Sequence, residues 1–249
     1  MKLNVRSSIA FGTNISTIEV PDALRKRTKS SIKYFDELLS GGFTPSVVTL
    51  FAGTPGAGKT TMLLSVADAL MGNGSIVVFN TMEESLFQVK MTAERLKLKN
   101  GFLTGEMSHI PTLLKECDKI RAANPGKQFF LMIDSLPCCD DGHWTGNDGV
   151  PVINSKSAER SLSLITEWCK STLSNAIVIN QVTKSGEMAG SQKLRHICDQ
   201  VISLKIEEKD PELRGCRILE IEKNRFGVSG VQQILEVSNN GLALVATIK

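Results

Sequence analysis

The stretch AGTPGAGKTT, residues 52–61, constrains the fold more than any other part of the chain. It contains the pattern G-x-x-x-x-G-K-T, in which glycines let backbone N–H groups wrap around phosphate oxygens and the next helix directs its positive N-terminal end at them. An apolar run precedes the pattern and a segment with helical periodicity follows it, which is the context that the pattern requires. The predicted nucleotide-binding residues are Gly53, Thr54, Pro55, Gly56, Ala57, Gly58, Lys59, Thr60 and Thr61.

Three residues have expected roles in binding ATP and Mg2+, the predicted cofactors. Lys59 is expected to contact the β- and γ-phosphates, and Thr60 to bind the metal through its hydroxyl. Asp134 follows the apolar run FFLMI, so it emerges at the carboxyl edge of the sheet beside the phosphate loop. An aspartate in this place holds Mg2+ directly or through a water molecule.

Apolar runs alternate with helical patterns along most of the chain, which indicates the α/β class. Strands are predicted at 47–53, 75–80, 128–134 and 176–180, and helices at 59–71, 84–97, 109–123 and 156–173. This alternation predicts a mostly parallel central sheet flanked by helices. After residue 198, the runs QVISLKI, RILEIEK, QQILEV and LALVAT are joined by short polar turns. They predict a C-terminal antiparallel extension of the same sheet.

The length of 249 residues suits one large domain, predicted at 30–249 and preceded by a basic arm or linker at 1–29. Within residues 1–33 the excess of Lys and Arg over Asp and Glu is larger than the net charge of +3 of the whole chain. Any attraction for nucleic acid is therefore local. The run RKRTK, residues 25–29, is either an arm for a phosphate backbone or an acidic partner, or a solvated flexible linker.

The cysteine and hydropathy patterns indicate the cellular compartment of the protein. The six cysteines are scattered without a C-x-x-C pair, which indicates free thiols in a reducing compartment. No run approaches the roughly 18 apolar residues of a membrane span, and the N-terminus lacks the pattern of a secretory signal. We therefore expect a cytoplasmic protein with no membrane partner.

The segment FNTMEES places two carboxylates at the end of a second predicted strand. Glu83 at this edge of the sheet is positioned to polarise an attacking water molecule, and we favour it as the general base. The alternative is that Glu83 and Glu84 cap the following helix, because acidic side chains stabilise helix N-termini. One glutamate can also serve each purpose.

Several segments, in order over roughly residues 30–245, together resemble the RadA branch of the RecA-like ATPases. They are SIKYFDELLSGGFTPSVVTLFAGTPGAGKTTMLLSVADAL, EES after the second strand, NQVTKSGEMAGSQKLRHICDQVISL, and KNRFG at 223–227. The resemblance implies a P-loop NTPase fold of RecA type. RadA proteins normally add a four-cysteine zinc module and a protease-like domain, neither of which this sequence contains. Gln181 is more similar to RecA, since RadA proteins usually have histidine there.

The resemblance also implies how subunits cooperate. RecA-type proteins form homo-oligomers, as hexameric rings or filaments, in which ATP lies at the boundary between subunits. Lys223 and Arg225 of KNRFG would then act on the neighbour's ATP, and Gln181 would sense the γ-phosphate and relay its state to the next loop. The alternative for the two basic residues is a surface pair bonded to Glu220 or Glu222.

Two loops would contact DNA in a protein of this class, at 137–155 and about 183–196. In the second loop Lys184, Lys193 and Arg195 suit electrostatic contact with the backbone of single-stranded DNA, although a mobile solvated loop is the alternative. In the first, Trp144 can stack on a base. Its acidic residues, Asp140, Asp141 and Asp148, oppose phosphate. The segment CCDDGH, 138–143, also has the composition of a metal site, which we disfavour because no companion ligands are evident.

These observations predict an ATP-hydrolysing, oligomeric DNA-binding protein acting in recombination or repair, by strand exchange or branch migration. A DnaB-type replicative helicase core is one alternative. A regulatory ATPase of the KaiC kind, acting on protein partners without DNA, is the other.

Overall fold

The computed structural model describes residues 9–143, 145–146, 149–181 and 192–248. Within these residues the strands form one nine-stranded sheet with the order β3-β2-β4-β5-β1-β6-β7-β8-β9. The strands are β1 Val48–Gly53, β2 Ile76–Thr81, β3 Leu103–Gly105, β4 Phe129–Asp134, β5 Asn175–Gln181, β6 Gln200–Ile206, β7 Arg217–Asn224, β8 Gln232–Ser238 and β9 Gly241–Ile248. The α-helices are α1 Asp22–Arg25, α2 Lys33–Leu38, α3 Lys59–Gly72, α4 Leu86–Arg95, α5 Ile110–Ala122, α6 Ser155–Thr172 and α7 Gln192–Ile197, with 3-10 turns η1 Ile15–Thr17 and η2 Leu136–Cys138.

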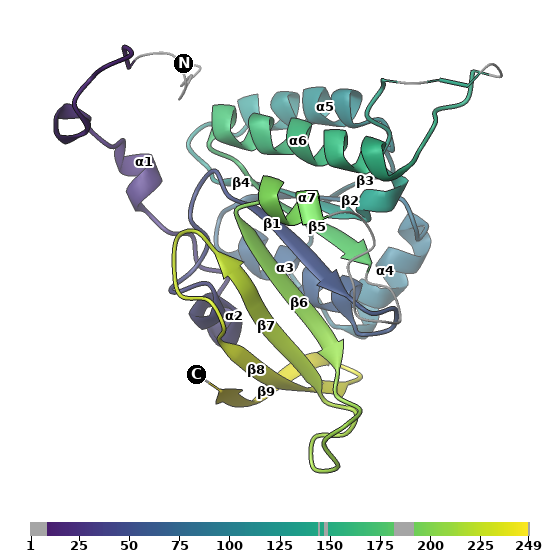
Figure 1. Ribbon diagram of the computed structural model, residues 1–249. Helices are drawn as coiled ribbons and strands as arrows, with labels where there is room; N and C mark the ends of the chain where they lie inside the picture. Colours follow the sequence, from purple (N-terminus) through teal and green to yellow (C-terminus); the bar gives the residue numbers. More distant parts are fainter. Residues whose placement is uncertain (1–8, 144, 147–148, 182–191, 249) are drawn as a thin grey trace.

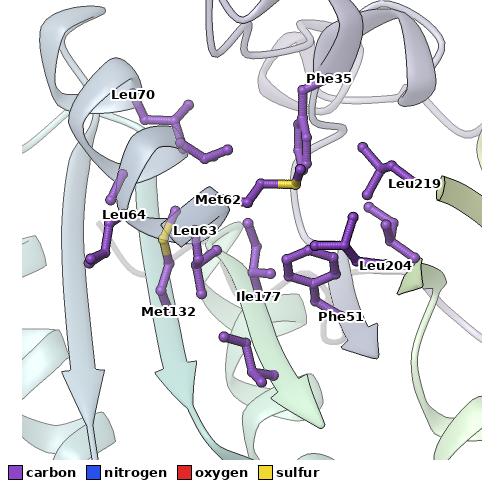
Figure 2. Packing of buried hydrophobic residues seen from close by; sticks show 14 of the residues in the cluster. Phe35, Phe51, Met62, Leu63, Leu64, Leu70, Met132, Ile177, Leu204 and Leu219 are labelled. Carbon is purple, nitrogen blue, oxygen red and sulfur yellow. The ribbon is translucent and has the colours of Figure 1, made fainter. Parts of the chain in front are cut away.

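The predicted α/β fold with a mostly parallel sheet is confirmed, and helices cover both of its faces (Figure 1). Successive side chains of a strand point to opposite faces. In β4, Phe130 and Met132 therefore join the core beneath α2 and α3, whereas Phe129 and Leu131 join the core beneath α5 and α6. Figure 2 shows side chains of α3 meeting those of the sheet in the first of these cores. Burial on both faces explains why these strands are near-continuously apolar.

The C-terminal extension differs from the prediction in one strand. β6 pairs with β1 in parallel, and only β7, β8 and β9 continue the sheet in antiparallel order. After α7, the chain begins β6 at the amino edge beside the start of β1, where the Asp199 N–H donates to the carbonyl oxygen of Val48. The strand β3, which the sequence did not predict, is three residues long and mostly exposed, so it lacks an apolar run.

The register of the parallel strands brings the ends of β1, β2, β4 and β5 together. Gly53 is paired with Gln181, and Thr81 with Asp134. All four residues end their strands at the same, carboxyl edge of the sheet, where ligands bind in open α/β sheets. Among the described residues, no helix is long and apolar enough to cross a membrane.

Candidate active site

The phosphate loop connects the end of β1 to the start of α3, as predicted. Gly56 and Gly58 have φ of +74° and +101°, a region in which a side chain is strained. A Cβ on Gly53 would collide with the carbonyl oxygen of Leu204 in the neighbouring strand β6. The loop therefore requires glycine at these positions, for its own conformation and for its close approach to β6.

The Lys59 side chain lies inside this loop and is 8% exposed. Its ammonium donates hydrogen bonds to the carbonyl oxygens of Gly53 and Thr54, at 2.9 and 3.0 Å. Burial lowers the pKa of Lys59, while the nearby carboxylates of Asp134 and Glu83 raise it. The positive charge is thus held where phosphate oxygens would replace the two carbonyl acceptors.

Thr60 and Asp134 meet across the site. The Thr60 hydroxyl donates a hydrogen bond of 2.6 Å to Oδ2 of Asp134, a residue that is 3% exposed. Burial raises the pKa of Asp134 to about 6, helped by the charge of Glu83 and opposed by the bond from Thr60. A hydroxyl and one carboxylate fit Mg2+, which prefers oxygen ligands and commonly takes one or two of them from the protein and others from phosphates and water.

Glu83 lies next to this pair. Its Oε1 accepts hydrogen bonds from the Ser135 hydroxyl and, at 3.1 Å, from the side-chain amide of Gln181. The structure therefore brings together two residues predicted from sequence, Glu83 and Gln181. Ser135, which follows Asp134, was missed because a lone serine after a strand carries no distinctive pattern.

Neither glutamate of the EES segment caps α4. Ser85 is the N-cap, and its side chain and that of Gln88 form a capping box. The backbone of Glu84 instead pairs with the hydroxyl of Thr81. The alternative that the glutamates cap the helix is wrong, because serine accepts the terminal N–H bond here. Glu83 as general base stays a prediction.

Arg217, the first residue of β7, also reaches the phosphate loop. Its Nε donates a hydrogen bond of 2.9 Å to the carbonyl oxygen of Ala57. Sequence reasoning missed this contact, because it depends on the antiparallel extension folding back to the loop from 160 residues away. Through this hydrogen bond, Arg217 connects the phosphate loop to strand β7.

In KNRFG the two basic residues contact their own chain. Lys223 donates to the carbonyl oxygens of Arg195 and Cys198, at 2.5 and 2.8 Å, near the end of α7. Arg225 forms an ion pair of 3.0 Å with Asp199. Pairing with Glu220 or Glu222 is therefore wrong, since those two carboxylates pair with other basic residues.

The predicted DNA contacts are only partly within the described residues; Lys184 lies outside them. Lys193 forms a 3.7 Å ion pair with Glu159 but remains 74% exposed, and Arg195 forms a 2.7 Å ion pair with Glu222. Both charges lie on or beside the short helix α7 that follows β5. Exposure leaves Lys193 available to a phosphate backbone.

Two acidic residues make structural contacts within the described part of loop 137–155. Asp140 and Asp141 are both buried, and Asp140 accepts a hydrogen bond from the Gly142 N–H. Burial raises the pKa of Asp141, but hydrogen bonds from Arg160 of α6 and the His143 N–H, with the charge of Arg160, outweigh burial and leave that pKa lowered. Arg160 offsets the charge of Asp141, whereas Asp140 forms no ion pair within the described residues, so the expectation that the acidic residues oppose phosphate stays a prediction. Trp144 and Asp148 lie outside the described residues. No group of three metal-ligating side chains occurs in the described part of the chain, CCDDGH included.

Comparison with known proteins finds similarity to ATPases, which agrees with the phosphate loop described above. A family model described as "ATPase: KaiC" matches residues 28–106. DNA repair protein RadA of Aquifex aeolicus is 31% identical over 219 residues, which cover 87% of this chain and 46% of that protein. A solved ATPase domain of another protein has a TM-score of 0.72 at 16% identity, covering 90% of this chain and 93% of that one. The chain is therefore similar to DNA repair protein RadA over most of its own length, and it has the fold of a solved ATPase domain.

Two further proteins match this chain over most of its length. DNA repair protein RadA of Bacillus subtilis is 29% identical over 248 residues, 95% of this chain and 50% of that protein. A DnaB-like replicative helicase, solved in a study of its interactions with primase, has a TM-score of 0.72 at 15% identity, covering 86% of this chain and 61% of that one. At such identities the solved structures show the fold. The chain spans about half the length of the RadA relatives it matches. The predicted resemblance to a RadA-type ATPase core is confirmed.

Proposed function

We propose that this RecA-like ATPase couples ATP hydrolysis to DNA binding in recombination or repair, by strand exchange or branch migration. The hydrogen bond between Glu83 and Gln181 carries the proposal, because it joins the hydrolytic group to the last residue before segment 182–191. The similarity to proteins named DNA repair protein RadA supports the biological setting.

The residues of the site divide the chemistry among them. Lys59 and the loop N–H groups bind the phosphates. Thr60 and Asp134 would hold Mg2+, which would supply positive charge to the phosphate oxygens. Glu83 orients a water molecule and takes its proton as the oxygen attacks the γ-phosphorus. The bond from that phosphorus to the bridging oxygen breaks, and ADP and phosphate leave.

The neighbouring subunit completes the site in this proposal. Lys223 and Arg225 lie at the end of β7, and the Arg225 side chain is 48% exposed. Reaching a neighbour's ATP requires Arg225 to exchange Asp199 for a phosphate, and Lys223 to exchange two carbonyls. A homo-oligomer, ring or filament, follows from this division of the site.

Single-stranded DNA is the proposed partner at the loops following β4 and β5. Lys184, Lys193 and Arg195 contact its backbone, so binding weakens as salt rises. Lys193 and Arg195 then trade carboxylate partners for phosphates. Because Gln181 precedes the second loop, DNA bound there changes how Gln181 holds Glu83.

Branch migration of a labelled four-way junction and strand exchange with homologous oligonucleotides, each with ATP, test the biological task. We expect one of them to proceed with wild type and to fail with Lys59→Ala. Unwinding of a forked duplex without either activity would favour the replicative-helicase alternative.

The second candidate is a regulatory ATPase that acts on protein partners, which the match to the family model described as "ATPase: KaiC" favours. Its hydrolysis would be indifferent to DNA. Hydrolysis rates with and without DNA therefore separate the two candidates.

A further inference from the structure

The basic run RKRTK does not project freely from the ATPase body. Thr28 and Phe43 exchange two backbone hydrogen bonds of 2.9 and 2.8 Å. The guanidinium of Arg27 donates to the carbonyl oxygens of Leu39, Gly42 and Phe226. The interpretation of the whole run as a flexible linker is therefore wrong from Arg27 onward, because these bonds fix its backbone against the body of the domain.

Two turns of the sheet's amino edge meet this run. Asn73, in the turn between α3 and β2, donates to the backbone oxygen of Lys29 and to the Ser31 hydroxyl, at 3.0 and 2.8 Å. The turn between α5 and β4 lies alongside, since the Ile76 N–H donates to the carbonyl oxygen of Gln128. The N-terminal run and the two turns thus form one continuous surface.

A cavity of about 490 Å³ opens between these three segments. Four of its lining residues are basic, Lys26, Arg27, Lys29 and Lys127, and none of the described residues that line it is acidic. The other residues that line the cavity have small or polar side chains, such as Thr28, Ser31 and Asn73. No aromatic side chain lines the cavity in the described chain.

Its three lysines carry charges that the protein leaves uncompensated. Lys26, Lys29 and Lys127 are exposed, and none forms an ion pair within the described residues. Arg27, by contrast, is satisfied by three carbonyls and serves as the anchor of the run. Like charges gathered without counter-charges favour an anionic ligand.

We propose that this cavity, which we call the amino-edge pocket, binds the phosphate backbone of DNA as a second contact, at the opposite edge of the sheet from the loops after β4 and β5. Spaced lysines without aromatic or acidic neighbours suit phosphate contact that does not read the bases. The pocket lies before β2 and β4, whereas the nucleotide site lies after them, and six residues of strand separate the two edges by about 20 Å. One DNA strand at the pocket therefore leaves the ATP site open. The inference rests on the proposed DNA binding and adds a second place on the protein where DNA is bound.

The test compares two triple variants with equal loss of charge. Lys26→Ala/Lys29→Ala/Lys127→Ala removes the pocket charges, and Lys99→Ala/Lys115→Ala/Lys209→Ala removes three exposed lysines elsewhere. Affinity for a fluorescent single-stranded oligonucleotide is measured by anisotropy over a range of salt concentrations. Circular dichroism and basal ATP hydrolysis report whether each variant is folded.

For the pocket variant we expect an affinity lower by about 10-fold and a salt slope shallower by roughly 2, since each phosphate contact contributes about 0.7 on single strands. The control variant should bind as wild type does apart from a small general charge effect. Equal binding by both variants, with wild type binding DNA, overturns the pocket and leaves the proposed function standing. No DNA binding by wild type overturns both. Unchanged DNA binding together with lysine-dependent binding of polyglutamate would assign the pocket to an acidic protein instead.

Discussion

The side-chain amide of Gln181 donates a hydrogen bond of 3.1 Å to Oε1 of Glu83, the oxygen that also accepts from Ser135. Three segments far apart in the chain therefore hold one carboxylate beside the phosphate loop. A carboxylate with two donors on one oxygen has its position fixed while its other oxygen stays available. That is the arrangement required of a group that must receive a proton from a bound water molecule.

Replacing Glu83 tests this role. Glu83→Gln keeps the size of the side chain but removes its ability to accept a proton, so kcat for ATP hydrolysis should fall by about 10²–10⁴ while ATP binding changes little. Steady-state kinetics and binding of a fluorescent ATP analogue measure the two effects. Glu84→Gln is the matched control and should hydrolyse ATP normally. A normal kcat for Glu83→Gln would remove Glu83 from the mechanism.

The raised pKa of Asp134 predicts a pH-dependent stability in nucleotide-free, EDTA-treated protein. Burial raises its pKa from 3.8 to about 6, so the folded state binds this proton more tightly than the unfolded state does. Wild type therefore loses stability as pH rises from about 4 to 6, whereas Asp134→Asn has no such group to ionise. The Tm of the variant should match that of wild type below pH 4 and exceed it above pH 6. A Tm difference that is constant with pH would contradict the assignment.

Arg217 supplies a prediction about ATP affinity. Arg217→Met removes a charged donor to the Ala57 carbonyl, so the KM for ATP should rise about 10-fold with kcat within a few-fold of wild type. Arg217→Lys should recover part of the affinity, since lysine keeps the charge. Arg214→Met, an exposed arginine in the preceding turn, is the control. A loss confined to kcat would argue against a role in holding the loop.

Shared active sites predict complementation between two defective proteins. Lys59→Met and Lys223→Met should each lose most ATPase activity, the second by about 10³ or more if Lys223 acts on the neighbour's ATP as trans-acting basic residues do. In a mixture, some interfaces pair an intact Lys59 with an intact Lys223, so partial activity should return. A mixture as inactive as its components, under conditions where the two proteins co-assemble, would contradict action across the subunit boundary.

The parallel core and the phosphate loop could be predicted from sequence because each depends on a local pattern. Buried strands such as β4 are continuously apolar, and glycine spacing alone marks the turn at Gly56 and Gly58. Asp134 could be placed because it ends such a strand in the right order. These features need no knowledge of distant partners.

Other features could not be predicted, because they depend on which distant segments meet. β6 has the length and composition of its antiparallel neighbours, and only the crossover through α7 sets its direction. Arg217 reaches Ala57 through the folding back of β7, and the carbonyl partners of Lys223 belong to a different element. The ion pair between the buried Asp141 and Arg160 likewise could not be predicted, because the sequence of this loop shows only that it is acidic.

The central claim is that DNA controls hydrolysis at this site through Gln181. The most direct test is the steady-state rate of ATP hydrolysis with and without a single-stranded oligonucleotide, for wild type and Gln181→Ala, with Lys59→Ala as the inactive control. We expect DNA to stimulate wild type, and Gln181→Ala to lose the stimulation together with part of its basal rate, because Glu83 then keeps only the Ser135 donor. A wild-type rate that is the same with and without DNA, at concentrations where DNA is bound, would contradict the account.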